Sequence, residues 1–141
     1  SIELINDPVM TSVTGMPSTT VLGDFIIQSD AALATLSGLS ALQSIHGQLK
    51  LDNNKALTSL SAFPATSASI QGGLAVTNNA ALVDMGGLSH FNYVGGINIT
   101  GNASLPYCAA HEVAQCVISY AGTPTIGGNK NTTTNCTYWC N

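Results

Sequence analysis

The sequence predicts a mainly β fold, a parallel β-solenoid that ends in one helix and a disulfide-tied tail. The first observation is an Asn or Asp that recurs at intervals of 23, 24, 25, 23 and 27 residues. The second is that apolar residues lie three and five positions before it in the first five repeats, a period of two typical of a strand with one buried face. We number each repeat from the recurring residue as position zero, which is Asp7, Asp30, Asn54, Asn79, Asn102 and Asn129.

After position zero the apolar spacing changes from two residues to three. The second repeat shows this over Leu33, Leu36, Leu39 and Leu42. A unit of 23–25 residues that joins a strand to such a return segment is typical of a solenoid, in which stacked repeats bury one continuous core. We therefore expect a single solenoid domain over 1–141, with repeats over 1–105 and a C-terminal cap over 106–141.

The first repeat begins at Ser1, and its SIELIND matches the strand and corner of later repeats. Neither an initiator Met nor a basic leader precedes it, so we interpret the sequence as a processed chain. No polar cap precedes it either, although terminal repeats of solenoids normally need one, and we expect something else to cover this end. Later strands begin near glycines, which fits corners with a sharp turn or a positive φ angle. These glycines are Gly23, Gly47, Gly72, Gly73, Gly95 and Gly96.

The position-zero column is expected to form a hydrogen-bonded ladder. Stacked about 4.8 Å apart, its side chains can bond to backbone groups of neighbouring repeats that would otherwise be buried and unpaired. The alternative is a local turn preference of Asn and Asp. We favour the ladder because a turn needs such a residue only locally, whereas this column runs through all six repeats.

The stretch 106–122 is expected to be a helix, because it starts with a proline, is rich in alanine and ends at a glycine. Cys108 and Cys116 would then lie about 12 Å apart along the helix axis, beyond the reach of a disulfide. Each is expected to pair with the tail, and we prefer Cys108 with Cys136 and Cys116 with Cys140. A Cys136–Cys140 bridge would leave two free thiols, and zinc is disfavoured because CxxC pairs are missing.

Four cysteines in the last 34 residues indicate an oxidising compartment, so we expect an extracellular protein, secreted or at the cell surface. Four sequons support this location. Their glycosylation candidates are Asn98, Asn102, Asn131 and Asn135.

Three stretches, GQLKLDNNKALTSLSAF, GGLAVTNNAALVDMGGL and GGINITGNASLPYCAA, resemble the receptor L-domain type of leucine-rich-repeat protein. The N-x-x-L-P-x-C entry into the predicted helix and the last G-N before a cysteine resemble the end of surface proteins of this kind. The resemblance covers nearly the whole chain and implies a secreted or cell-surface fold, but no particular ligand. The chain departs from the family in lacking charged loops and in its additional Cys116 and Cys140.

Composition and motifs argue against several functions. Only 7% of the residues are charged, seven acids face three lysines, and there is no arginine, which argues against nucleic acid as a partner. No apolar run reaches the 18 residues of a membrane span. The acids are spread over several repeats, and His46, His90 and His111 occupy unrelated repeat positions, so we expect neither an enzyme nor a cofactor or metal site.

The outward face of the strands remains as a candidate binding surface. Residues two and four positions before position zero should point to solvent and form a strip about 24 Å long. The strip can bind a protein or a glycan, and the alternative is a plain solvated sheet. Its candidate binding residues are Gln28, Lys50, Asp52, Thr77, Asn98 and Thr100.

Three functions follow from these expectations. The first is a glycosylated structural or adhesive protein that self-associates into a fibril or surface coat through its uncapped first repeat, because low charge permits unclosed head-to-tail contacts. The second is a monomeric recognition module that uses the strip. The third is ice binding, which is ranked last because Thr77, Thr100 and Thr125 form no regular array.

Overall fold

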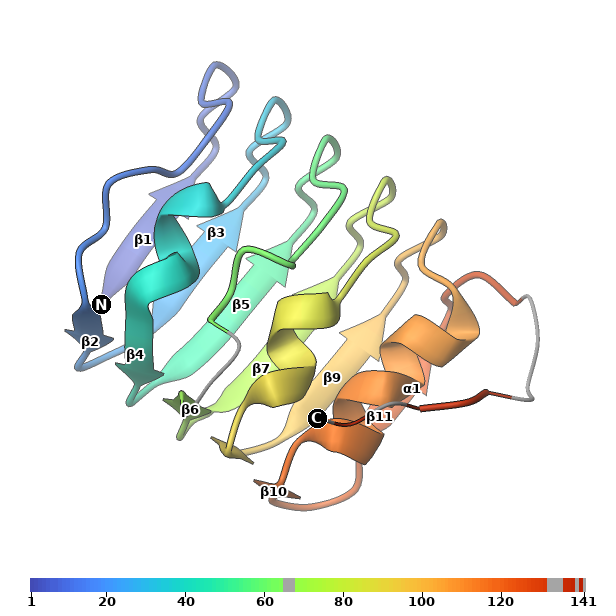
Figure 1. The fold of residues 1–141 in the computed structure, drawn as a ribbon. Helices are drawn as coiled ribbons and strands as arrows, with labels where there is room; N and C mark the ends of the chain where they lie inside the picture. The colour runs from blue at the N-terminus through green and yellow to red at the C-terminus, as the bar shows by residue number, and fades with distance from the viewer. Residues whose placement is uncertain (65–67, 132–135, 139, 141) are drawn as a thin grey trace.

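The computed structural model describes residues 1–64, 68–131, 136–138 and 140. The protein is mainly β, with two parallel sheets and one α-helix near the C-terminal end (Figure 1). Successive repeats lie side by side along the molecule, an arrangement compatible with the predicted solenoid.

The larger sheet contains six parallel strands, one from each repeat, in the order β1-β3-β5-β7-β9-β11. Its register places equivalent repeat positions side by side, as in the pairs Leu4 with Ile27 and Leu51 with Val76. The strands predicted from the period of two are therefore confirmed. They are β1 (Ile2–Ile5), β3 (Phe25–Gln28), β5 (Gln48–Asp52), β7 (Gly73–Thr77), β9 (Ile97–Thr100) and β11 (Thr125–Gly127).

A second parallel sheet, which the sequence did not predict, has five short strands in the order β10-β8-β6-β4-β2. The period of three concealed it, because Leu42 and Ile45 are three residues apart yet belong to one strand and are both buried. Strands of two to four residues also leave too few alternations to detect. They are β2 (Thr19–Val21), β4 (Leu42–Ile45), β6 (Ser69–Ile70), β8 (Tyr93–Val94) and β10 (Ser119–Tyr120).

Helical segments cover the side of the core opposite the six-stranded sheet. Two of them are 3₁₀ helices, η1 (Ser37–Ala41) and η2 (Gly86–His90). A 3₁₀ helix has three residues per turn, so the apolar period of three keeps one face of it buried. Leu39 in η1 and Leu88 in η2 accordingly have no exposed surface.

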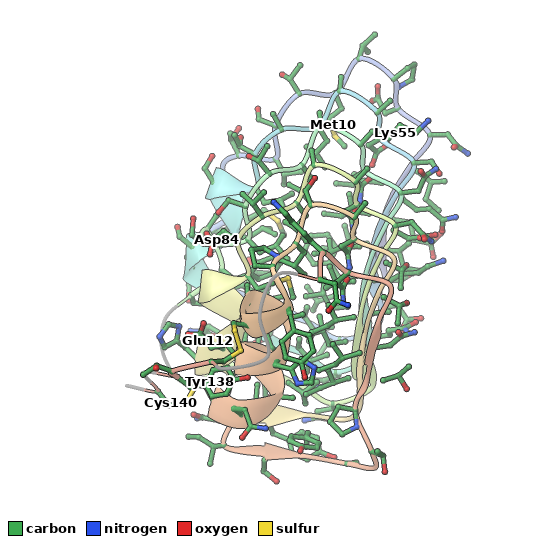
Figure 2. All side chains as sticks on the ribbon, turned by 90° about the vertical axis from the view of Figure 1, so that its right-hand side faces the viewer. Met10, Lys55, Asp84, Glu112, Tyr138 and Cys140 are labelled. Carbon is green, nitrogen blue, oxygen red and sulfur yellow. A yellow bond between two sulfur atoms is a disulfide. The ribbon has the colours of Figure 1, made fainter. Side chains whose placement is uncertain are left out.

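The core runs continuously between the six-stranded sheet and the helical segments. Leu33, Leu57, Leu82 and Leu105, three residues after position zero in their repeats, are all completely buried. Burial decreases at both ends of the stack, where Leu4 and Met10 of the first repeat and Ile126 of the last are only partly buried. Figure 2, viewed from the C-terminal side of Figure 1, shows side chains filling the space between the sheet and the helices.

The predicted helix over 106–122 is too long. Helix α1 spans Tyr107–Cys116, and the chain then enters β10. The backbone N–H of Ser119 donates to Asn92 at 3.1 Å and that of Ala121 to Val94 at 3.2 Å, so the second sheet captures this segment. The β-branched pair Val117 and Ile118 favours the extended backbone over another helical turn.

The preferred disulfide pairing is confirmed. Cys108 is bonded to Cys136 and Cys116 to Cys140, with Cα–Cα distances of 5.4 Å and 5.0 Å. Both bridges tie the tail to α1, and Figure 2 shows Cys140 beside the helix. Two disulfides in a chain of this size are typical of an oxidising compartment. Among the residues described, no helix combines the length and hydrophobicity that crossing a bilayer demands.

Candidate functional site

The position-zero side chains connect each repeat to the one before it. In every case the backbone N–H of position zero donates to Oδ1 of the position-zero residue in the next repeat, over 2.7–3.1 Å. The inner members Asp30, Asn54, Asn79 and Asn102 have no exposed surface. These bonds run between repeats, so the column does more than shape its own turn.

The asparagines of this ladder make a second bond that aspartate cannot make. Nδ2 of Asn54 donates to the carbonyl oxygen of Ile27 at 3.0 Å, three positions before position zero in the preceding repeat. The other asparagines repeat this geometry at 2.9 Å, to Leu51, Val76 and Ile99. One carboxamide therefore supplies an acceptor and a donor to the same neighbouring corner.

Asp30 is the exception inside the ladder. Its Oδ1 accepts the N–H of Asp7 at 2.7 Å, but its Oδ2 is buried and has no hydrogen-bond partner among the described residues. In the asparagines, Nδ2 takes the place of Oδ2 and donates to the carbonyl oxygen three positions before position zero in the preceding repeat. For Asp30 that carbonyl belongs to Leu4. A buried oxygen without a partner costs about 1–3 kcal/mol, so Asp30 weakens the contact between the first two repeats.

Asp30→Asn is therefore expected to raise the free energy of unfolding by about 1–2 kcal/mol, because Nδ2 could donate to Leu4 as Asn54 donates to Ile27. Chemical denaturation of the two proteins measures the difference. Asn54→Asp is the reciprocal variant and should destabilise, because it removes the same donor one repeat further along. Equal stability of Asp30→Asn and the natural sequence would contradict this reading.

The ladder overturns one glycosylation expectation. Asn102 is completely buried, and its Nδ2 donates to Val76 at 2.9 Å and to Asn129 Oδ1 at 3.1 Å, so the folded chain has no room for a sugar on this nitrogen. By contrast, Asn98 and Asn131 are exposed. The fourth sequon asparagine, Asn135, lies outside the described residues.

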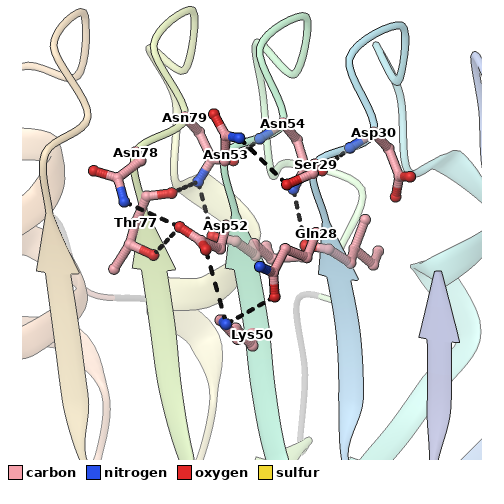
Figure 3. Close-up of polar contacts among 12 residues, drawn as sticks. Gln28, Ser29, Asp30, Lys50, Asp52, Asn53, Asn54, Thr77, Asn78 and Asn79 are labelled. Atoms are coloured by element: carbon pink, nitrogen blue, oxygen red, sulfur yellow. Dashed lines mark hydrogen bonds and ion pairs between the residues drawn. The ribbon is translucent and has the colours of Figure 1, made fainter. Parts of the chain in front are cut away.

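The outward face of the six-stranded sheet carries a polar network centred on Asp52 (Figure 3). Thr77 Oγ1 donates to Asp52 Oδ1 at 2.7 Å and Asn78 Nδ2 donates to the same oxygen at 3.1 Å. Lys50 Nζ lies 3.8 Å from Asp52 Oδ2 and donates to Gln28 Oε1 at 2.8 Å. Side chains from three adjacent strands are thus held together before any partner arrives.

The rest of this face is smaller and less charged. Thr100 Oγ1 donates to the exposed Asn98 Oδ1 at 3.1 Å within the same strand. Ala75, expected to point to solvent, is only 8% exposed because it is short and its register neighbours are Lys50 and Asn98. The six candidate binding residues therefore share one face, with one ion pair among mostly neutral groups.

Sequence reasoning missed the column directly before position zero. All its residues have a positive φ angle, between 56° and 72°. The sequence does contain a sign of this conformation, because most residues of the column are Asn or Gly, which tolerate the left-handed conformation better than other residues. Two members also bond across repeats, since Asn53 Nδ2 donates to Ser29 Oγ at 3.3 Å and Asn78 to Asp52. The column is Asn6, Ser29, Asn53, Asn78, Gly101 and Gly128.

The remaining titratable groups are dispersed. Asp84 accepts from Ser59 Oγ at 2.6 Å and from the Gly86 N–H at 2.9 Å, which gives it a structural role. Burial, with smaller effects from Tyr107 and Glu112, raises the pKa of Tyr138. No group of three potential metal ligands occurs within the described part of the chain.

The C-terminal end of the stack is hollowed on both sides of Ile126. One cavity of about 280 Å³ is lined by Tyr107, Gly127, Gly128, Asn131 and others, and one of about 260 Å³ by His111, Tyr120 and others. Strand β11 is the last strand of its sheet and β10 the last of the other. The end therefore presents apolar side chains beside two sheet edges.

Comparison of the chain with protein-family models, curated proteins and solved structures finds no significant match.

Proposed function

We propose that the chain is an extracellular, non-enzymatic structural protein of the leucine-rich-repeat L-domain type that associates end to end. One observation carries the proposal: among the described residues, both parallel sheets terminate at each end in edge strands, β1 and β2 at one end and β11 and β10 at the other. An unpaired parallel edge is a template for another strand, and heterologous contacts that do not close produce filaments.

The two ends match in direction and chemistry. The strands of the larger sheet all run parallel, so β1 of a second copy can continue the sheet beyond β11 without reversal. Partly buried apolar residues lie at both ends, Leu4 and Met10 at one and Ile126 and Tyr120 at the other. With only three lysines and seven acids among 141 residues, few charged side chains oppose a contact between copies.

The hydrogen-bonded ladder of position-zero residues can continue across a contact between two copies. Asp30 Oδ1 accepts the N–H of Asp7, and Asp7 of a second copy can accept the N–H of Asn129 in the same way. Asp7 is exposed, and because its Oδ1 already accepts the N–H groups of Val9 and Met10 at 3.0 Å, its Oδ2 is the oxygen left for a neighbouring copy. N-linked glycans at Asn98 and, on copies whose β11 edge is free, at Asn131 belong to this proposal as surface modifications.

End-to-end association is tested by light scattering after size-exclusion chromatography and by electron microscopy. The natural sequence should form species well above 14.4 kDa, whereas Ile126→Lys should remain monomeric because a charge would be placed beside the β11 edge. Val83→Lys is the matched control, since Val83 is 50% exposed and lies away from both ends, and it should associate like the natural protein. Monomers at every concentration, or equal association of the two variants, would refute the proposal.

A second candidate is recognition of a protein or glycan by the strip. The preformed Asp52 network favours it, because held side chains lose less entropy when a partner binds. Ice binding receives no such support, because the register pairs Thr77 with Thr100 but Thr125 with Asn98, so the threonines do not form one row.

A further inference from the structure

The cavity of about 280 Å³ beside β11 has a neutral lining of one aromatic ring, one alkyl side chain, two carboxamides and two glycines. Its volume lies near the lower limit of about 300 Å³ for small-molecule sites, which suits a single sugar ring better than a larger ligand. The absence of charge among these lining residues selects against ions and favours a neutral ligand with several hydroxyl groups. The lining is Tyr107, Ile126, Gly127, Gly128, Asn129 and Asn131.

Tyr107 supplies a fixed aromatic surface. Its ring packs on His111, one helical turn later, with ring centroids 4.1 Å apart and an interplanar angle of 30°. The adjacent Cys108 is bonded to Cys136, which anchors this turn of α1 to the tail. The Tyr107 side chain also lines the cavity, where its ring can stack on the C–H groups of a pyranose, a contact that rigid aromatic rings make at little entropic cost.

The edge of β11 supplies backbone hydrogen-bonding groups. Strand β11 pairs with β9 alone among the described strands, and the Gly127 carbonyl accepts the N–H of Gly101 at 3.0 Å. Because backbone groups alternate in direction along a strand, those of Ile126 face away from β9. Gly128 occupies the repeat position of Gly101, whose N–H points to the next repeat, so the Gly128 N–H also faces away from β9. The missing side chains of Gly127 and Gly128 let a ligand approach this backbone closely.

The two carboxamides have different roles. Both polar ends of Asn129 are occupied, since Nδ2 donates to Ile99 at 2.9 Å and Oδ1 accepts from Asn102 at 3.1 Å. Asn129 is thus held in place by the ladder, and among the described residues only the second N–H of its Nδ2 remains as a donor for a ligand. Asn131 is exposed at its rim and is also the asparagine of a sequon.

We propose that this cavity is a saccharide subsite, with a pyranose ring stacked on Tyr107 and its hydroxyl groups bonded to the β11 edge. The sugar can be the first residue of a glycan attached to Asn131 or part of a separate carbohydrate chain, and both present the same chemistry. The inference goes beyond end-to-end association, because binding of a sugar to a single copy does not require a second copy. The two are alternatives at this end of the molecule, since a sugar bonded to the β11 edge occupies the edge on which β1 of a second copy would pair.

The first arm of the test uses unglycosylated, disulfide-bonded protein at concentrations where it is monomeric. Titration with N,N′-diacetylchitobiose, followed by amide chemical shifts, should perturb Gly127 and Gly128. Tyr107→Ser should weaken binding at least about tenfold, whereas Tyr107→Phe should retain it because the ring remains. The disaccharide should not perturb the amides of Thr77 and Thr100 on the strip, which serve as the internal control.

The second arm uses protein from a secretory host that attaches N-glycans, with the glycan trimmed to its first sugar. That sugar on Asn131 should raise the melting temperature relative to Thr133→Ala, which destroys the sequon, and Tyr107→Ser should abolish the difference. The matched control is the sugar on Asn98, whose effect, measured against Thr100→Ala, should not depend on Tyr107.

The outcomes separate the two sources of the sugar. A response in the first arm identifies a separate saccharide, and a Tyr107-dependent response in the second identifies the attached one. No response in either arm, with Asn131 shown by mass to be occupied in the second, overturns the proposal. Neither readout depends on copies associating, so this failure is distinct from failure of the proposed assembly.

Discussion

Asn79→Ala is expected to lower the free energy of unfolding by about 3 kcal/mol or more. Asn79 Oδ1 accepts the N–H of Asn54 at 2.9 Å, and its Nδ2 donates to the carbonyl oxygens of Leu51 at 2.9 Å and Thr77 at 3.0 Å. Alanine leaves the buried Asn54 N–H without a partner, at about 1–3 kcal/mol for each such group, and opens a polar cavity. The loss should appear as a lower denaturant midpoint at an unchanged m-value.

The matched substitution is Asn92→Ala, because Asn92 is exposed and lies outside the ladder. It should change stability by less than about 0.5 kcal/mol. Asn79→Asp separates the two functions of the carboxamide, since it keeps the acceptor for Asn54 but removes the donor to Leu51. A loss below about 1 kcal/mol for Asn79→Ala would show that water or relaxation replaces the ladder bonds.

Gly95→Ala is expected to destabilise the protein by about 3 kcal/mol or more, because repeats approach closely at this corner. A Cβ atom on Gly95 would overlap the carbonyl oxygen of Gln71 and lie 2.8 Å from its carbonyl carbon, and both are backbone atoms. The Gly95 N–H also donates to Ile70 at 2.8 Å, so the two segments cannot separate without losing a bond. Overpacking against backbone can be relieved only by moving a whole repeat.

The neighbouring Gly96 provides the control. A Cβ atom there would come no closer than 3.9 Å, to the carbonyl oxygen of Ala121, and its φ angle is not positive. Gly96→Ala should therefore change the free energy of unfolding by less than about 1 kcal/mol. Thermal or denaturant unfolding of the two variants decides the matter, and similar losses for both would exclude close approach as the reason for glycine at position 95.

The corner glycines also show where sequence reasoning reached its limit. A sharp turn or a positive φ angle was the expected reason for them, yet of the six named only Gly73 has a positive φ angle. The others include Gly47 and Gly72, where a Cβ atom would meet the backbone of the preceding corner. The distance between the backbones of successive corners depends on how the repeats stack, and it cannot be predicted from a single sequence.

Other features could be predicted from the sequence because they depend on a local pattern of residues. The period of two located Leu51 and Val76 on paired strands, and the separation of Cys108 from Cys116 along a helix was enough to pair both with the tail. The second sheet was not readable, because strands such as Ser69–Ile70 are too short to show a period. The prediction of glycosylation at Asn102 was wrong, because a sequon is defined by three consecutive residues, whereas the burial of Asn102 results from the stacking of the repeats.

The location of the disulfides has a consequence for how the chain folds during synthesis. Both bridges close loops within residues 108–140, so oxidation restricts the unfolded chain only there. Residues 1–107 consist of segments whose strands find their partners about 24 residues away, and each must dock on a neighbour to bury its apolar face. The ribosome makes this constrained segment after residues 1–107. Ordering is therefore expected to nucleate at the C-terminal end and proceed towards Ser1, opposite to the direction of translation.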